Sequence, residues 1–547
     1  METVDDLFIR LDQLNEIGAA LSQEKNLDAL LEKILQAAQA ITRADGGTLY
    51  LLEEGRQLKF AIMRNVSLNI AMGGTTGNPI PFYPIQLYDQ EKKPNNQMVA
   101  AFSVLSGETI NIADAYAIKG FDFSGTRNFD KKTGYRSKSF LTVPMRNHEG
   151  EIIGVLQLIN SKSPNGEVLA FSNSDQRLAE SLASQAAIAL TNRQLIIQLE
   201  ELFESFIELI NSAIDEKSPY TGGHCQRVPV LTMMLAEAVN DTKSGPLAGF
   251  ALSDKDRYEL KIAGLLHDCG KVTTPVHVVD KATKLESIYD RINLLDTRFE
   301  VLKRDAEIAA LKQQLEFSRK DDIDEMNWRS HVHSTDMGLR ERLRQLDEDR
   351  EFLRHHNIGG EFMRPEAKAR VREIGESYLW KDPSGNIAQF LTEDEINNLT
   401  IERGTLTAAE REVINHHIVA TVNMLEALPW PRHLRNVPEY AGGHHERMDG
   451  KGYPRGLTRD QMSIPARVMG IADIFEALTA KDRPYKRGKT LSESLYIMGK
   501  FKEGGHIDPD LFDIFIRQKV YMRYAKQFLE AQQIDTVDET KVPGYIP

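Results

Sequence analysis

A stretch near the middle of this 547-residue chain, residues 175–218, contains neither glycine nor proline, and it limits the fold more than any other feature. Both residue types disfavour helices, so their absence permits one helix of about 44 residues, some ~65 Å long. Apolar residues recur in it at alternating intervals of four and three, which predicts a left-handed coiled coil. The predicted seam consists of Leu178, Leu182, Gln185, Ala189, Asn192, Ile196, Leu199, Phe203, Phe206 and Ile210.

The polar residue Asn192 in this seam is of the kind that fixes the register and the number of strands in a coiled coil. We therefore expect a parallel homodimer in which residues 176–218 connect an N-terminal domain to a C-terminal one. A helix that packs only on its own N-terminal domain is the alternative that the sequence leaves open.

The N-terminal part, residues 1–175, mixes helical and strand patterns. Short β-type runs occur at 47–52, 139–144 and 152–159, and polar turns such as 147–150 separate them. This combination predicts an α+β domain with an antiparallel sheet.

This part also contains the short motifs Phe129-Asp130, Thr133-Gly134-Tyr135, Gly154-Val155 and Ile159-Asn160. Together they resemble the GAF domain, a fold that senses small molecules, and in particular the cyclic-nucleotide GAF domains of phosphodiesterases. The resemblance implies ligand-binding positions at Asn160, Phe171 and Asp175, while Ser161 and Gln176 replace the Lys and Glu of that subfamily's signature. A sensory pocket for a small molecule and a purely structural or dimerising domain both remain open.

The overall composition narrows the classes of function. The net charge is −13 (67 Lys and Arg against 80 Asp and Glu), which disfavours broad binding to DNA. No apolar run is long enough to span a membrane, and the first residues are acidic rather than typical of a signal peptide. We expect a soluble, cytoplasmic protein whose two cysteines build no disulfide framework.

The C-terminal part concentrates residues that bind metals. Imidazoles and carboxylates suit iron, manganese and other first-row ions, and a carboxylate can bridge two of them. Two adjacent ions can drive the hydrolysis of a phosphodiester by in-line displacement. The motifs are His224-Cys225, His267-Asp268-Cys269-Gly270-Lys271, His416-His417, His444-His445-Glu446-Arg447-Met448-Asp449-Gly450-Lys451-Gly452-Tyr453-Pro454 and Ala472-Asp473-Ile474-Phe475-Glu476.

The combination of these motifs over residues 219–285 and 404–520 resembles the HD-GYP family, metal phosphohydrolases that hydrolyse cyclic di-GMP. The resemblance implies two divalent ions, iron or manganese, with Asp268 as their bridge. Tyr220 replaces the glutamate that binds a third ion in some members. The implied ligands are His224, His267, Asp268, His417, His444, His445 and Asp473, with His416 as the alternative to His417.

Further residues are implied to act on the substrate. Lys271, one helical turn after His267, is placed to meet a phosphate oxygen or to assist the leaving group. Arg483 and Lys486 are implied to contact the phosphate or guanine of the dinucleotide. The segment Gly452-Tyr453-Pro454 is expected to form a rigid loop beside the substrate.

The resemblance is interrupted between residues 286 and 405. Apolar residues at helical spacing predict a helical hairpin there, which could be a lid, a partner dock, a dimer contact or an excursion without a regulatory role. The sequence thus predicts a multidomain protein: an α+β GAF sensor domain (1–175), a coiled-coil helix (176–218) and an all-α HD-GYP domain (219–547) with a helical insertion.

The function predicted from these motifs is hydrolysis of cyclic di-GMP to pGpG, and perhaps onward to GMP, under control of the GAF domain. Two alternatives differ in kind. One is an adaptor that binds the cyclic dinucleotide without hydrolysing it, and the other is a hydrolase of another nucleotide or cyclic dinucleotide.

Overall fold

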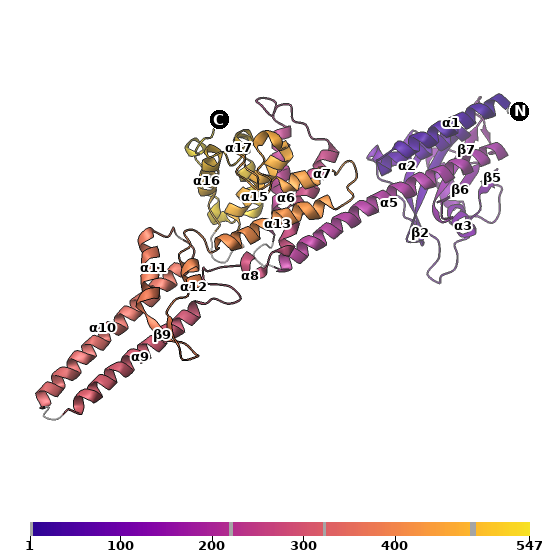
Figure 1. Cartoon of the computed structure of the whole chain (residues 1–547). Helices are drawn as coiled ribbons and strands as arrows, with labels where there is room; N and C mark the ends of the chain where they lie inside the picture. Colours follow the sequence, from indigo (N-terminus) through magenta and orange to yellow (C-terminus); the bar gives the residue numbers. More distant parts are fainter. Residues whose placement is uncertain (1–3, 218–222, 321–323, 361, 482–487) are drawn as a thin grey trace. The chain divides into compact units, whose positions relative to one another are not determined.

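The computed structural model of the protein describes residues 4–217, 223–320, 324–360, 362–481 and 488–547. The chain divides into two compact units, Met1–Glu204 and Ser205–Pro547 (Figure 1). Helix α5 (Asn173–Lys217) contributes residues to both units and runs for 45 residues without a break, as its lack of glycine and proline predicts. Among the described residues, no helix combines the length and the apolar character that crossing a bilayer requires.

The first unit is built on one antiparallel sheet in the order β3-β2-β1-β7-β6-β5, with β4 paired to β2 and β8 paired to β7. The predicted α+β domain with an antiparallel sheet is confirmed. The strands are β1 (Ala44–Glu53), β2 (Gln57–Asn65), β3 (Ile70–Gly73), β4 (Ile85–Gln86), β5 (Ile110–Ile112), β6 (Phe140–Arg146), β7 (Ile152–Lys162) and β8 (Val168–Leu169). The helices besides α5 are α1 (Val4–Gln23), α2 (Leu27–Thr42), α3 (Val99–Ser106) and α4 (Ser124–Thr133).

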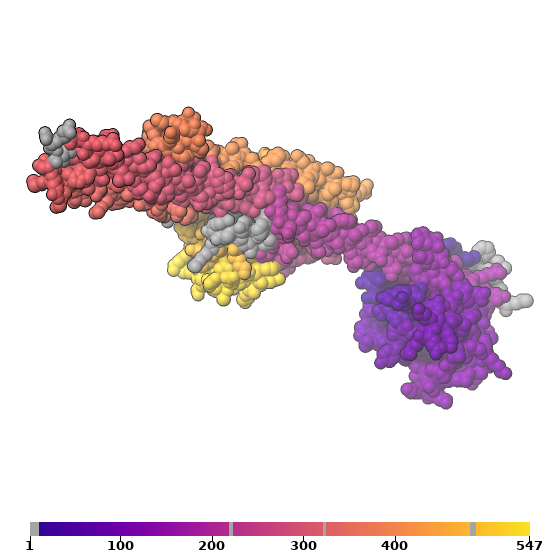
Figure 2. Space-filling model, turned by 90° about the horizontal axis from the view of Figure 1, so that it is seen from below, coloured from indigo at the N-terminus to yellow at the C-terminus, as the bar shows by residue number. Residues whose placement is uncertain are grey.

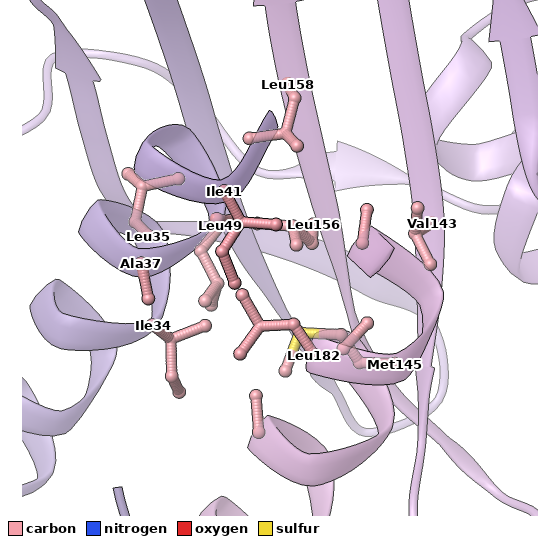
Figure 3. Close-up of a cluster of buried hydrophobic side chains, with 14 of the residues drawn as sticks. Ile34, Leu35, Ala37, Ile41, Leu49, Val143, Met145, Leu156, Leu158 and Leu182 are labelled. Carbon is pink, nitrogen blue, oxygen red and sulfur yellow. The ribbon is translucent and has the colours of Figure 1, made fainter. Parts of the chain in front are cut away.

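One face of this sheet carries the main core of the unit. Side chains from β1, β6 and β7 pack there against α2 and the first turns of α5, as Figure 3 shows with Ile34, Leu49, Val143, Leu156 and Leu182. Strand residues next to these in sequence point to the other face, because side chains alternate along a strand. That second face packs against residues of α3 and the segments that flank α4.

The start of the predicted coiled-coil seam is wrong. Leu178 and Leu182 are buried in the core of the first unit, so they are not available to a partner helix. An exposed stripe of α5 keeps the alternation of four and three and shares Asn192, Leu199 and Phe206 with the predicted seam. It consists of Ile188, Asn192, Leu195, Leu199, Leu202, Phe206 and Leu209, and the predicted Ile196 and Ile210 are exposed beside it. The helical period is as predicted, but periodicity alone does not tell which neighbouring element covers a face of the helix.

The second unit is helical except for a small sheet of β9 (Leu379–Lys381) and β10 (Ile387–Gln389). Its helices before the insertion are α6 (His224–Asn240), α7 (Asp254–Leu266), the short 3-10 helix η2 (Cys269–Thr273) and α8 (Val276–Val279). Those after the insertion are α13 (Ala408–Glu426), α14 (Val437–Gly442), α15 (Ile464–Thr479), α16 (Leu491–Glu503), α17 (Pro509–Arg517) and α18 (Val520–Phe528).

The insertion contains the predicted helical hairpin. Helices α9 (Ile292–Ser318) and α10 (Glu325–Asn357) pack side by side (Figure 1), and their side chains form one continuous surface, red in Figure 2. The sequence did not predict the elements that follow, α11 (Pro365–Ser377), the β9–β10 pair and α12 (Glu393–Leu399). Together these elements enclose a core of their own, which includes Phe299, Leu346 and Phe390.

Buried polar contacts fasten both ends of the insertion to the start of α13. The ammonium group of Lys281 lies 2.8 Å from both carboxylate oxygens of Glu410 and 2.9 Å from Oδ1 of Asn398. Glu410 in turn completes the capping box of α13 with Thr407. The helices of the second unit before and after the insertion are therefore joined in space although the insertion separates them in sequence.

Candidate metal centre

Five elements of the second unit bring the predicted ligands together. His224 begins α6, and His267 and Asp268 lie between the end of α7 and the start of η2. His417 lies within α13, His444 and His445 follow α14, and Asp473 lies within α15. These elements pack on one another, α6 against α7 and α15, and η2 against α13.

Gly270 explains how the segment after His267-Asp268 comes close to α13. Its backbone N–H donates to Oγ1 of Thr421 at 2.9 Å. A Cβ atom at this position would stand 2.0 Å from the carbonyl oxygen of His417 and 2.5 Å from the backbone nitrogen of Thr421. Only glycine permits this approach, which places Asp268 beside His417.

The ligands form two groups that could each hold a metal ion, His224 with His267 and Asp268, and His417 with His444 and His445. Within each group the ligand atoms all lie within 4.8 Å of one another. Asp268 connects the groups, since Oδ2 lies 3.1 Å from Nε2 of His224 and 3.2 Å from Nε2 of His267, while Oδ1 lies 3.3 Å from Nε2 of His417.

Asp473 lies at the same centre. Its Oδ1 is 3.3 Å from Nε2 of His224 and 4.0 Å from Nε2 of His267. The structure therefore brings together all seven predicted ligands, and it places His416, the alternative to His417, on the exposed side of α13.

Backbone carbonyls orient three of the imidazoles. Nδ1 of His267, His417 and His444 lies 2.7, 2.5 and 2.6 Å from a carbonyl oxygen three residues earlier in the chain. A carbonyl only accepts hydrogen bonds, so each Nδ1 carries the proton and each Nε2 presents its lone pair to the centre.

The surroundings of Nε2 of His444 show that a metal ion fits this centre. The atom is fully buried and has no hydrogen-bond partner among the described residues. An unsatisfied buried polar atom is costly, and a cation in the group would satisfy it. The donor set, imidazole nitrogens and carboxylate oxygens, suits iron or manganese.

The charges at the centre also suit a cation. Burial alone would raise the pKa of Asp268, but Lys271 and the neighbouring histidines hold it well below its usual value. Burial lowers the pKa of His444, and it lowers the pKa of His445 to about 4. At neutral pH the carboxylate is thus ionised and these two imidazoles are uncharged, which are the forms that bind metals.

Lys271 lies where it could act on a substrate beside Asp268. Its Nζ is 2.5 Å from Oδ2 of Asp268, and its side chain is about three-quarters buried. Although burial lowers the pKa of this ammonium, the charge of Asp268 raises it above its ordinary value, so Lys271 stays positively charged.

The Gly452-Tyr453-Pro454 loop covers His445. The ring of Tyr453 stacks on that imidazole with centroids 4.9 Å apart and planes 19° from parallel. A Cβ atom on Gly452 would come within 2.4 Å of the backbone nitrogen of Arg447, so the loop is tightly folded. Arg483, Lys486 and Tyr220 lie outside the described residues.

One residue at the centre was missed as a functional group by the sequence reasoning. Glu476 follows Asp473 by one helical turn, and its Oε2 lies 2.5 Å from Nδ1 of His224. The spacing of three in Asp473-Ile474-Phe475-Glu476 was the available signal, because such residues share one face of a helix.

The two cysteines border the centre but are buried and free. Burial raises the pKa of Cys225 to about 12 and that of Cys269 to about 11, so both are neutral thiols. This agrees with a packing role.

The predicted ligand residues of the first unit have partners within the domain. The amide of Asn160 accepts from the backbone N–H of Lys138 at 2.7 Å and donates to the hydroxyl of Tyr135 at 2.8 Å. Asp175 pairs with Arg10 at 3.1 Å, and Phe171 is buried in the core. A GAF ligand at these positions stays a prediction.

Comparison with known proteins identifies the domains. Residues 26–190 match the GAF domain family, and residues 221–348 and 389–511 match HD domain families. The chain therefore carries a GAF domain followed by an HD domain, as predicted. The two HD matches stand on either side of part of the insertion.

Individual relatives match over shorter stretches. A 3′3′-cGAMP-specific phosphodiesterase from Vibrio cholerae is 46% identical over 15% of this chain and 19% of its own length. A dual 3′,5′-cyclic-AMP and -GMP phosphodiesterase from Takifugu rubripes is 29% identical over 37% of this chain and 21% of its own. A cyclic di-GMP phosphodiesterase from Pseudomonas aeruginosa is 35% identical over 27% of this chain and 33% of its own. The chain thus spans a third or less of these relatives.

Proposed function

We propose that this protein is a metal-dependent phosphodiesterase that hydrolyses a cyclic dinucleotide, with cyclic di-GMP as the predicted substrate and pGpG as the first product. The observation that carries the proposal is Asp268, which lies between two groups of imidazoles and contacts both. The names of the relatives support the same class of reaction. A cytoplasmic location also stays a prediction.

The two groups would hold two divalent ions, iron or manganese, with Asp268 shared between them and Asp473 on the side of His224 and His267. Such a pair supplies an activated water and stabilises the attacking and leaving oxygens of a phosphodiester. The protein's own contribution is to fix the imidazoles through backbone carbonyls and to keep Asp268 ionised.

Lys271 would donate to a phosphate oxygen of the substrate. We expect Lys271→Met to lower kcat by ~10²-fold, the usual effect of removing one electrostatic contact to a transition state. The metal content should not change, because lysine is not a ligand. Steady-state kinetics with metal analysis would check this, with exposed Lys526→Met on α18 as the control. Unchanged kcat in Lys271→Met would remove Lys271 from the mechanism.

Product analysis tests the reaction itself. The manganese-loaded protein would be incubated with cyclic di-GMP and, separately, with 3′3′-cGAMP, and products would be separated by chromatography. Formation of pGpG supports the proposal. Faster cleavage of 3′3′-cGAMP than of cyclic di-GMP would identify 3′3′-cGAMP as the preferred substrate, as for the relative from Vibrio cholerae. Binding of either without product would support an adaptor instead.

We also propose that the protein is a homodimer through the exposed stripe of α5. The stripe keeps the four-and-three alternation that parallel helices need, and its members include Leu199 and Leu209, both 64% exposed. Exposed Asn192 at one seam position would pair with its own copy and fix the register.

Leu199→Asp is expected to weaken this dimer by ~100-fold or more, because each copy loses a buried leucine and gains a charge at the seam. Analytical ultracentrifugation over a range of concentrations measures the change. Gln198→Asp, exposed on the same turn but outside the stripe, is the matched control. A wild-type monomer at micromolar concentration would contradict the proposal.

Contacts made by the C-terminal end of α5 support the proposal that the GAF domain regulates the metal centre. Nδ2 of Asn211 donates to the carbonyl of Leu265 at 2.9 Å, and the ammonium of Lys217 donates to the carbonyl of Val272. Both carbonyls flank the segment that carries His267, Asp268 and Lys271. A movement of α5 would therefore be transmitted directly to metal ligands.

A further inference from the structure

Glu476 is buried between the two helices that carry His224 and Asp473. Its side chain is 1% exposed, and its two oxygens face different groups on α6. Oε2 lies 2.5 Å from Nδ1 of His224, and Oε1 lies 2.7 Å from Nε of Arg227. A buried carboxylate needs such charged or donating partners to remain stable.

The contacts form a matched pattern across the two helices. His224 and Arg227 are three residues apart on α6, and Asp473 and Glu476 are three residues apart on α15. The ring of His224 therefore stands between two carboxylates, with Nε2 facing Asp473 at 3.3 Å and Nδ1 facing Glu476. A histidine that binds a metal through Nε2 carries its single ring proton on Nδ1, and Glu476 accepts that proton's hydrogen bond.

We infer that Glu476 is a positioning residue that holds His224 in the orientation and tautomer needed to bind a metal, with Arg227 fixing the carboxylate. The inference rests on the metal centre proposed above. It concerns one of the two groups, since the contacts of Glu476 reach His224 whereas His417 and His444 are held by backbone carbonyls.

Glu476→Gln separates this role from simple packing. A glutamine side chain has one acceptor oxygen. If that oxygen accepts the hydrogen bond from Arg227, the NH₂ group of the glutamine faces Nδ1 of His224. The imidazole would then accept at Nδ1 and carry its proton on Nε2, where it cannot bind a metal. The size and shape of the side chain hardly change.

The test uses the full-length protein and manganese alone. We expect Glu476→Gln to lower the affinity for one of the two manganese ions by ~10- to 100-fold, as is usual for residues that orient metal-bound histidines. The affinity for the other ion should not change. Equilibrium dialysis with metal analysis gives the stoichiometry. Electron paramagnetic resonance should change from a coupled pair to the signal of isolated Mn²⁺. Glu476→Asp, which keeps a carboxylate, should restore part of the loss.

Control variants make the outcome specific. Glu259→Gln changes another buried glutamate of the same unit, one that accepts from Asn436 rather than from a ligand, and it should bind two ions. His224→Gln should lose the same ion as Glu476→Gln, and the double variant should lose no more. Circular dichroism of the metal-free variants checks that they fold.

The results distinguish this inference from the proposed function. Wild type and Glu476→Gln that bind two ions with equal affinity would overturn the role of Glu476 and leave the metal centre intact. A wild-type protein that binds no ion would overturn both. A loss in Glu476→Gln that adds to the loss in His224→Gln would also reject the inference, because the residue would then act elsewhere.

Discussion

Replacing Asp268 by asparagine should abolish hydrolysis of the cyclic dinucleotide. Both carboxylate oxygens face ligands, Oδ2 towards His224 and His267 and Oδ1 towards His417. An amide keeps one acceptor oxygen and places an NH₂ group at the other position, so only one of the two groups of imidazoles keeps an oxygen of residue 268 and no bridge between them remains. We expect turnover to fall by ~10³-fold or more, since the loss of one electrostatic contact already costs ~10²- to 10³-fold.

Chromatography of the products, with metal analysis of the same samples, measures this effect. Asp460→Asn, an exposed acid in the 3-10 helix before α15, is the matched control and should behave as wild type. If Asp268→Asn cleaves the substrate at the wild-type rate, the bridge is not part of the reaction.

Gly270→Ala is expected to have the second-largest effect, this time through packing. The added Cβ would lie 2.0 Å from the carbonyl oxygen of His417 and 2.6 Å from Oγ1 of Thr421. Both atoms belong to α13, so η2 and α13 must separate. Overpacking of this kind costs about 1–3 kcal/mol or more, and the shift would carry Asp268 away from His417.

Urea denaturation of the metal-free protein and turnover of the loaded protein would report the two consequences. Gly338→Ala is the control, because that glycine lies within α10 and a Cβ there meets nothing within 4 Å. Alanine should stabilise that helix by ~0.5–1 kcal/mol. Wild-type stability and activity of Gly270→Ala would mean that η2 and α13 are not in such close contact.

The elements that the sequence predicted best depend on local pattern. The long α5 follows from the lack of glycine and proline, and β1, β6 and β7 follow from short apolar runs between polar turns. The seam of α5 was predicted only in part, since burial of Leu178 depends on a sheet that is distant in sequence. The elements α11, α12 and the β9–β10 pair lacked a comparable repeat and were missed.

The candidate site divides in the same way. The resemblance of the combined motifs to the HD-GYP family implied which histidines and aspartates meet, because no single motif is specific by itself. The motifs did not predict how the imidazoles are oriented, since every residue has a backbone carbonyl and the sequence does not show that the carbonyl of Gly264 contacts His267. Glu476 was visible in the motif, but its role depends on α6 and α15 packing together.

Anomalous X-ray diffraction from crystals of the manganese-loaded protein tests the central claim most directly. Two peaks are expected in each chain, one beside His224 and His267 and one beside His417, His444 and His445, with Asp268 contacting both. A single peak, a third peak at the centre, or peaks that do not contact Asp268 would contradict the account of a two-metal phosphodiesterase.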